Sequence, residues 1–362
     1  MSRPSWMSRR PTLRGYRRMG VGARLAVGTV MLLALVIVVG LVSLGLGPVE
    51  IPISHVAWIL ISPFGIDVPD FGRTEQLVIE QIRLPRLVVG ASVGIALGLA
   101  GATMQGLFRN PMADPGIIGV SAGGALGAVV AISTGTAALF LMALPVFAFV
   151  GAIAAAFLVY AIAAVGGRFS MATLLLAGVA INAFLGAVVS AIILFLPDNE
   201  ALREVLFWLA GGLDSRSWDH ARIASPLILG SAFLLLLMSR DLNLLMLGDD
   251  EARSMGVRVG RMRVLLLVTA ALATGAAVAV SGVIAFVGLV IPHIMRLLLG
   301  PDNRVLIPMS ALGGAVFVLA VDTVARTIIA PAEFRLGVLT AFVGAPFFIF
   351  LLIRNKRQVY SL

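Results

Sequence analysis

Residues 83–108 read RLPRLVVGASVGIALGLAGATMQGLF, and this stretch is the clearest single indication of the fold class. After its two arginines it contains no ionisable residue. About 20 such residues in a helix span the roughly 30 Å hydrocarbon core of a bilayer. Gly90, Gly94 and Gly98 recur every four residues, so one helix face is smooth and admits a neighbouring backbone. The stretch predicts a transmembrane helix within a compact helical bundle.

The composition extends this interpretation to the whole chain. Of its 362 residues, 60% are apolar and only 12% are charged, and the mean hydropathy is +1.05. Soluble globular proteins carry about 25% charged residues, which they need for a hydrated surface. The composition therefore excludes a soluble enzyme, a nucleic-acid-binding domain and a disordered chain. The net charge of +9 comes from basic residues that lie between apolar runs, which is typical of membrane sidedness.

Apolar runs of similar character occur along the rest of the chain. With 83–108, the predicted spans are 25–46, 116–133, 138–165, 171–196, 223–238, 264–281, 282–299, 305–327 and 336–353. They predict an all-α polytopic membrane protein with about ten transmembrane helices. Residues 55–61 are too short to span and are expected to form a helix at the membrane surface. The long run through 281–282 either folds back at this boundary or forms one broken helix.

The distribution of basic residues predicts the orientation and the domain limits. If successive spans cross the membrane in alternating directions, residues 1–24 and every second connecting segment lie on one side. Most of the arginines are in these segments, and such an excess marks the cytoplasmic side. An even number of spans places both termini in the cytoplasm. We therefore expect a basic N-terminal tail over 1–24, a transmembrane domain over 25–353 and a cytoplasmic C-terminal tail over 354–362.

Residue counts exclude several kinds of chemistry. The chain has no cysteine, and its three histidines form no H-E-x-x-H motif, so no metal site or cofactor is expected. Its only lysine, Lys356, follows the last apolar run without a glycine-rich loop before it. The chain therefore has no Walker A site for ATP. If its work requires energy, another subunit or an ion gradient supplies it.

The longest polar segment on the cytoplasmic side reads DLNLLMLGDDEARSMGV and covers residues 241–257. Asp241 can cap a short helix that ends at Gly248, and either of the next two aspartates can cap a second one that ends at Gly256. The four leucines of the segment favour a surface on which a partner docks. An ordinary solvated loop is the alternative.

Three side chains keep other classes of protein open. Asp322 and Arg326 lie four residues apart on one helix face and can pair. An ion-coupled secondary carrier would use Asp322 or His293. A membrane-embedded hydrolase would use Ser121, which lies in a G-x-S-x-G string, but small residues on a packing face account for that string better.

As a set, several segments resemble the FecCD-type permeases of ABC importers, which take up ferric siderophores, haem and vitamin B12. The segments are 83–86, Gln105 with 109–115, 119–123, 247–257, 282–296 and 331–346. The resemblance implies a type II ABC importer permease fold in a bacterial inner membrane, without an ATPase site. The implied partners are a second copy in a homodimer, two ATP-binding cassette ATPases, an extracytoplasmic substrate-binding protein and the lipid bilayer, and no nucleic acid.

The resemblance also assigns roles to individual residues. The positions in the ATPase-coupling helices are held by Gly248, Asp249, Glu251, Ala252 and Gly256. The arginines that would meet acidic residues of the binding protein are Arg83, Arg86 and Arg326. The span 171–196 would line the translocation path, with Asn182 and Ser190 as its few polar side chains.

The resemblance gives one indication of the cargo. Residues 113–116 read ADPG, which is closer to the haem and vitamin B12 branches of these permeases than to the siderophore branch. Haem is therefore the expected cargo, and a ferric siderophore or vitamin B12 is the alternative.

Overall fold

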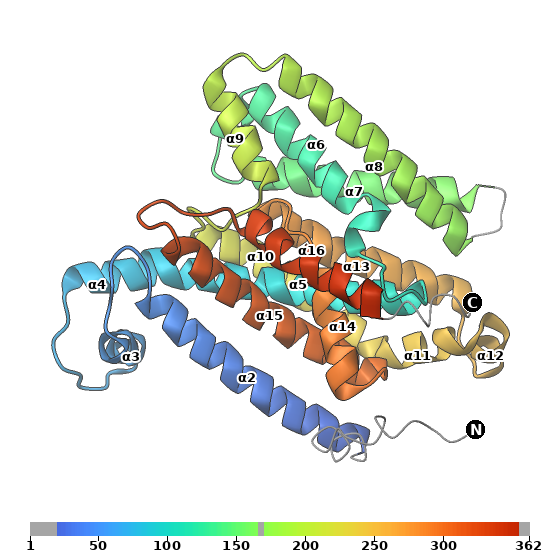
Figure 1. Cartoon of the computed structure of the whole chain (residues 1–362), viewed down its shortest axis with the longest axis horizontal. Coiled ribbons are helices and arrows are strands. Elements are labelled where there is room, and N and C mark those ends of the chain that lie inside the picture. Colours follow the sequence, from blue (N-terminus) through green and yellow to red (C-terminus); the bar gives the residue numbers. More distant parts are fainter. Residues whose placement is uncertain (1–19, 166–169, 355–362) are drawn as a thin grey trace.

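The computed structural model describes residues 20–165 and 170–354, and every regular element in this part of the chain is a helix (Figure 1). The predicted all-α class is therefore confirmed. Most of the predicted N-terminal tail, residues 1–19, lies outside the described residues. The predicted C-terminal tail lies outside them from residue 355 onward.

Within residues 20–165 and 170–354, seven helical segments are long and apolar enough to cross a membrane. They are α2 (Val21–Gly45), α7 (Ala143–Ala164), α8 (Met171–Leu194), α10 (Trp218–Leu237), α13 (Val259–Ser281), α15 (Asn303–Thr327) and the continuous segment Arg73–Leu107. That continuous segment comprises α4 (Arg73–Leu77), the π-helical turn η3 (Val78–Arg83) and α5 (Leu84–Leu107). Three shorter apolar helices are α6 (Val120–Ser133), α14 (Val287–Leu299) and α16 (Leu336–Arg354). Together these ten segments correspond to the ten predicted spans.

Several helices begin later than the apolar runs that contain them. Residues Pro115–Ile118 form the 3-10 turn η4, and Gly119 has a φ of +87°, so α6 begins only at Val120. The run through 281–282 folds back. Gly282, with a φ of +65°, ends α13, and α14 begins five residues later. An apolar run therefore predicts which residues lie within the membrane better than it predicts where a helix begins or ends.

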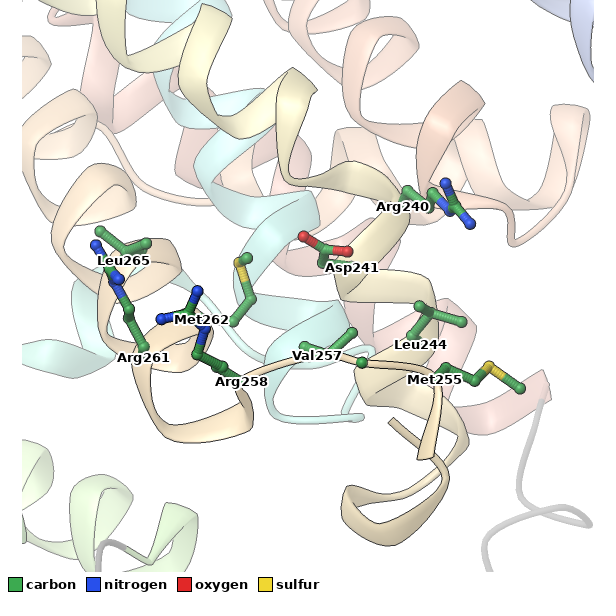
Figure 2. Close-up of a pocket in the computed structure, with 10 residues that line it drawn as sticks. Arg240, Asp241, Leu244, Met255, Val257, Arg258, Arg261, Met262 and Leu265 are labelled. Atoms are coloured by element: carbon green, nitrogen blue, oxygen red, sulfur yellow. The ribbon is translucent and has the colours of Figure 1, made fainter. Parts of the chain in front are cut away.

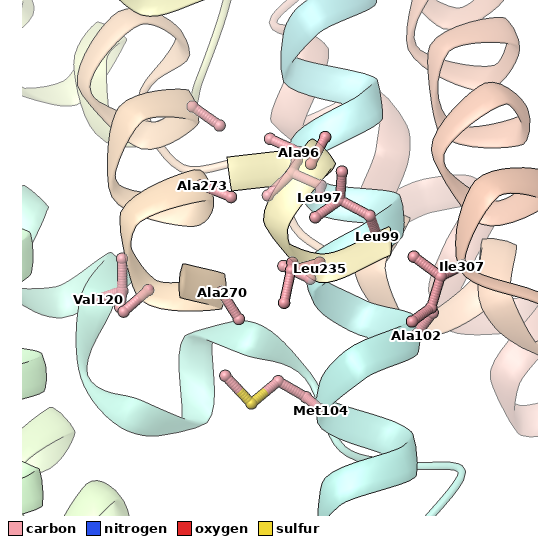
Figure 3. Packing of buried hydrophobic residues seen from close by; sticks show 14 of the residues in the cluster. Ala96, Leu97, Leu99, Ala102, Met104, Val120, Leu235, Ala270, Ala273 and Ile307 are labelled. Carbon is pink, nitrogen blue, oxygen red and sulfur yellow. The ribbon is translucent and has the colours of Figure 1, made fainter. Parts of the chain in front are cut away.

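Helix α5 lies at the centre of the bundle, where nearly all of its side chains are buried. Figure 3 shows its residues Leu97, Leu99 and Met104 packed among side chains of α6, α10, α13 and α15. The predicted glycine face of α5 allows a neighbouring helix to pack closely. A methyl group on Gly94 would overlap the carbonyl of Gly314, and one on Gly98 would overlap that of Ser310. Helices α5 and α15 can pack this closely only because these positions are glycine.

Helices α6, α7, α8 and the short α9 (Asn199–Leu209) form a second group to one side of α5 (Figure 1). Close packing again depends on glycine, because methyl groups on Gly123 and Gly127 would overlap backbone carbonyls of α7. Helix α13 contacts both groups and joins them. The apolar side chains that α2, α8 and α10 leave exposed fit a surface in contact with lipid or another subunit.

The bundle has two ends, named here after the short helices at each. The α3 end carries α3 (Ile53–Ile61), which is shorter than a membrane span and is joined to α4 by a 2.7 Å contact between His55 and Glu75. The α12 end carries α11 (Ser239–Leu247) and α12 (Asp249–Ser254). Figure 1 shows the two ends on opposite sides of the long helices.

Candidate functional site

The polar segment 241–257 folds as the predicted pair of short helices, α11 and α12, joined at Gly248. Gly248 has a φ of +150°, which side-chain-bearing residues rarely adopt. The predicted caps are wrong by a few residues. Helix α11 begins at Ser239, so Asp241 lies within its first turn, and Gly248 is the residue that precedes α12. Asp249 is then the first residue of α12, where its negative charge favours the helix N-terminus.

A glycine-based cap ends α12. The amide of Gly256 donates to the carbonyl of Arg253, and the amide of Val257 donates to that of Ala252. This pair of bonds is a Schellman motif, in which the residue after the helix takes a positive φ, here +88° at Gly256. Ala252 is fully buried and Val257 nearly so, which adds the apolar contact that commonly accompanies the motif. The predicted glycines thus fix both ends of α12.

Ion pairs hold the α11–α12 pair against the bundle. The Asp249 carboxylate lies 2.6 Å from Arg263 of α13 and 3.4 Å from Arg109, which follows α5. Arg109 also donates a 2.6 Å hydrogen bond to the carbonyl of Leu245. Two exposed apolar side chains remain at the tips of the pair, since Leu247 is 61% and Met255 is 58% exposed. The pair is a fixed knob whose exposed surface carries these two apolar side chains beside charged ones such as Asp250 and Arg253.

Asn243 joins α11 to the beginning of α15, a role that the sequence did not indicate. Its side-chain amide donates to Asp302 at 2.7 Å, and its oxygen accepts from the backbone and side chain of Asn303 at 2.9 and 2.8 Å. The sequence feature that could have indicated this role is a single asparagine among leucines.

Asp302 keeps this junction charged. Hydrogen bonds from Arg304, with a further one from Asn243, lower the pKa of Asp302 to about 2 despite partial burial. Because the pKa of Asp302 in the folded state lies below the ordinary value of about 3.9, its carboxylate stabilises the folded state fully above about pH 4. This stabilisation is lost as the pH falls through about 2, so the junction persists at physiological pH.

A pocket of about 450 Å³ lies beside this knob, and Figure 2 shows the residues that line it. Its walls come from α11, the end of α12 and the first turns of α13. The basic residues that line it are Arg240, Arg258 and Arg261, and Asp241 is the acidic one. The knob therefore lies beside a positively charged recess.

At the α3 end, Arg83 and Arg326 bind backbone carbonyls in the last turn of α2 and in the loop that follows it. Arg83 is 5% exposed and donates to the carbonyls of Leu44, Gly45 and Val49. Arg326 is 4% exposed and donates to Ser43 at 2.9 Å and to the Leu46 carbonyl at 3.3 Å. Both guanidinium groups thus close the turn after α2. Both side chains are buried, whereas the expected contact with a binding protein needs them to be accessible.

Arg86 lies at the centre of an ion network at the same end. Its guanidinium lies 2.8 Å from Asp322 and 2.9 Å from Glu333, and Asp214 is 3.8 Å away. Asp322 also lies 3.3 Å from Arg326, so the predicted i, i+4 pair is present. The network joins α5 and α15 to the segments before α10 and α16. Its acidic members could not be predicted as partners of Arg86, because they lie far from Arg86 in the sequence.

Asn182 and Ser190 make different contacts on α8. The Asn182 amide donates to the carbonyls of Gly116 and Ile117 at 3.2 and 3.3 Å, which fastens α8 to η4. The Ser190 hydroxyl is exposed and donates within its own helix to Gly186 at 3.0 Å. Their expected role in the translocation path stays a prediction.

These features define a multi-span helical membrane protein with a fixed two-helix knob at one end. The chain belongs to the FecCD transport family, whose profile matches residues 35–354. The resemblance found in the sequence is therefore confirmed.

Relatives with described cargoes fall into several branches. The chain is 44% identical over 301 residues to a cobalamin import permease, BtuC, of Halobacterium salinarum, which covers 83% of the chain and 79% of the relative. It is 45% identical over 280 residues to the hemin transport permease HmuU of Yersinia pestis, covering 76% and 83%. It is 38% identical over 289 residues to the Fe(3+)-citrate permease YfmD of Bacillus subtilis, covering 79% and 84%.

The fold also matches a solved structure. An ABC transporter assigned to the metal-chelate type, in an inward-facing conformation, superposes with a TM-score of 0.78 and 33% sequence identity. The match covers 89% of this chain and 97% of that one. The chain is therefore a permease of the ABC importer family that handles iron chelates, haem and vitamin B12. The secondary-carrier and hydrolase alternatives fall away.

Proposed function

We propose that the cargo of this permease is haem. The observation that carries the proposal is a pocket of about 560 Å³ beside α16, whose lining includes Phe342, Val338 and Leu209. Among the described residues that line it, none has a polar side chain. The apolar face of a flat molecule such as haem can lie there without leaving polar side chains of the pocket unpaired.

The chemistry of the alternatives is less favourable to such a surface. Vitamin B12 carries several amide groups, and burying an amide without a hydrogen bond costs about 1–3 kcal/mol on protein scales. Ferric citrate is strongly charged, so its desolvation against apolar walls costs more. The relatives support haem and cobalamin almost equally, at 45% and 44% identity. The apolar lining therefore favours haem.

The test uses the permease purified with its ATPase in lipid nanodiscs. Haemin should stimulate ATP hydrolysis at a concentration about tenfold lower than cyanocobalamin does, a difference of about 1.4 kcal/mol. Phe342→Ala should remove this preference. The matched control is Phe350→Ala on the same helix, outside the pocket lining, and it should keep the preference. Stronger stimulation by cyanocobalamin or ferric citrate would contradict the assignment.

We also propose an assembly, which membership of the same family supports. We place two ATPases at the α12 end, in contact with the knob that contains Gly248, Asp249, Glu251, Ala252 and Gly256. The permease hydrolyses no ATP itself. A substrate-binding protein meets the α3 end. The chain would lie in a bacterial inner membrane with the α12 end and both termini in the cytoplasm, in accord with the excess of arginine there.

We expect the permease to form a homodimer around one central path. One chain offers one knob, whereas ATP-binding cassettes act in pairs, and two-fold symmetry is the simplest closed arrangement. The exposed apolar side chains of α8, among them Leu176, Val179 and Phe184, provide surface for such a contact. Native mass measurement of the detergent-purified complex should give two identical permease chains. A stable complex with a second, different permease would refute this arrangement.

Docking of the binding protein on Arg83, Arg86 and Arg326 stays a prediction. Their burial limits how it could occur, because a partner can reach Arg83 or Arg326 only after local carbonyl contacts open. Arg86 is the most available of the three, since its partner Glu333 is 29% exposed at the side chain. An acidic residue of the partner would have to compete with Glu333 there.

A further inference from the structure

Two neighbouring pockets between α7 and α13 share a wall made of Tyr160 and Val264. One has a volume of about 330 Å³ and extends along α7, α8 and α13. Apart from Tyr160, every described side chain that lines it is apolar, for example Phe157 and Val268. The other has a volume of about 370 Å³ and lies at the α12 end. An apolar groove and a second pocket therefore meet at one tyrosine.

The second pocket is basic. Three arginines line it, Arg253, Arg261 and Arg263, and no carboxylate of the described residues does. Arg253 pairs with Asp250 and Arg263 pairs with Asp249. Arg261 has neither a hydrogen bond nor an ion pair to any residue in ranges 20–165 and 170–354. A positive charge without a partner in those ranges thus lies directly beside an apolar groove.

The position of the basic pocket matches the headgroup level of a membrane. Arg261 lies in the first turn of the membrane-spanning helix α13, and Tyr160 lies one turn before the end of α7. Tyrosine is enriched where apolar membrane meets water. The positive end of the α13 dipole adds to the field that an anion would experience there. Basic pockets between transmembrane helices at such a level suit anionic lipid headgroups.

We propose that an anionic phospholipid binds in this double pocket. Its phosphate lies among the arginines, with Arg261 as the main partner, and an acyl chain fills the groove between α7, α8 and α13. The continuity of a cationic and an apolar compartment favours an amphiphile. A protein partner at the α12 end could neutralise the arginines but would not occupy a groove that runs along the spans.

Gly260 offers a direct way to block the basic pocket. It lines that pocket, and a methyl group built on it meets no atom within 4 Å. A larger side chain at this position therefore enters the pocket space without disturbing the fold. Gly230 on α10 is a matched control, because it is also helical and open but does not line the double pocket.

The experiment is native mass spectrometry of the full-length permease with added dioleoyl-phosphatidylglycerol or dioleoyl-phosphatidylcholine. The unsubstituted chain should retain phosphatidylglycerol at least about tenfold more tightly than phosphatidylcholine, or about 1.4 kcal/mol. Gly260→Leu should lose this preference and Gly230→Leu should keep it. Equal retention of both lipids, or retention of the preference in Gly260→Leu, would overturn the proposal.

Two further measurements separate the contribution of the charge from that of the apolar contact. Arg261→Gln should weaken phosphatidylglycerol binding, and Arg261→Lys should retain most of it. Soluble glycerol 3-phosphate, which has the headgroup charge and no chain, should fail to displace the lipid at equal concentration. Displacement by glycerol 3-phosphate would show a simple phosphate site and refute the two-part pocket.

Discussion

A permease that carries both Leu247→Glu and Met255→Glu should fold normally but lose most of its affinity for the ATPase. Both side chains are exposed at the tips of the α11–α12 knob, so neither change disturbs internal packing. Burying an apolar side chain of this size at an interface is worth about 1.5–3 kcal/mol. Losing two such contacts should weaken association roughly 100-fold, or about 3 kcal/mol. Co-purification with the ATPase at matched permease yield measures this.

The control keeps the apolar surface and changes its shape. Leu247→Met with Met255→Leu should leave association close to normal. Ala252 is a poorer site for the same test because it is fully buried, so a charge there would disrupt α12 itself. Undiminished ATPase capture by the double glutamate variant would mean that the knob is not the coupling surface.

Asp322→Asn should destabilise the permease strongly although the side chain keeps its size. The Asp322 side chain is 3% exposed and is the shared counter-ion of Arg86 and Arg326. Removing its charge leaves two buried guanidinium groups without enough compensation. Breaking a buried pair in this way costs about 3–5 kcal/mol. Thermal unfolding in detergent should report a fall in midpoint on the order of 10 °C.

The same substitution at an exposed pair provides the comparison. Asp219 lies 3.5 Å from Arg222, and both side chains are more than half exposed. Asp219→Asn should therefore cost only about 0–1 kcal/mol. If the two variants unfold at the same temperature, the ion network at the α3 end is not a stability element.

The membrane spans were predictable because an uncharged apolar run of about 20 residues matches the thickness of a bilayer and exceeds what most soluble cores can bury. Their ends were not, since Pro115 and Gly119 delay α6 inside a run that is apolar throughout. The two-helix knob was predictable from its glycines and aspartates, which act within a few residues of their position. Its anchoring by Asn243 was not, because the partners of Asn243 come from a distant span.

Arg83 and Arg326 also show that contacts between distant parts of the chain cannot be predicted from the local sequence. Their number and spacing were visible in the sequence, and their location near span ends was inferred from it. Their burial was not, because it depends on carbonyls in the last turn of α2 that are 283 residues from Arg326 and 38 from Arg83. A charged residue near a span end can face water or close a turn, and only the tertiary contacts decide which.

The turn between α5 and α6 is held at both of its ends. Arg109 at its start contacts Asp249 of α12, and Gly116 and Ile117 at its end accept hydrogen bonds from Asn182 of α8. Prolines at 111 and 115 fix the backbone φ at two points between them. The turn is therefore a short, conformationally restricted connection. The turn thus links α12 to α8 through contacts that do not involve α15.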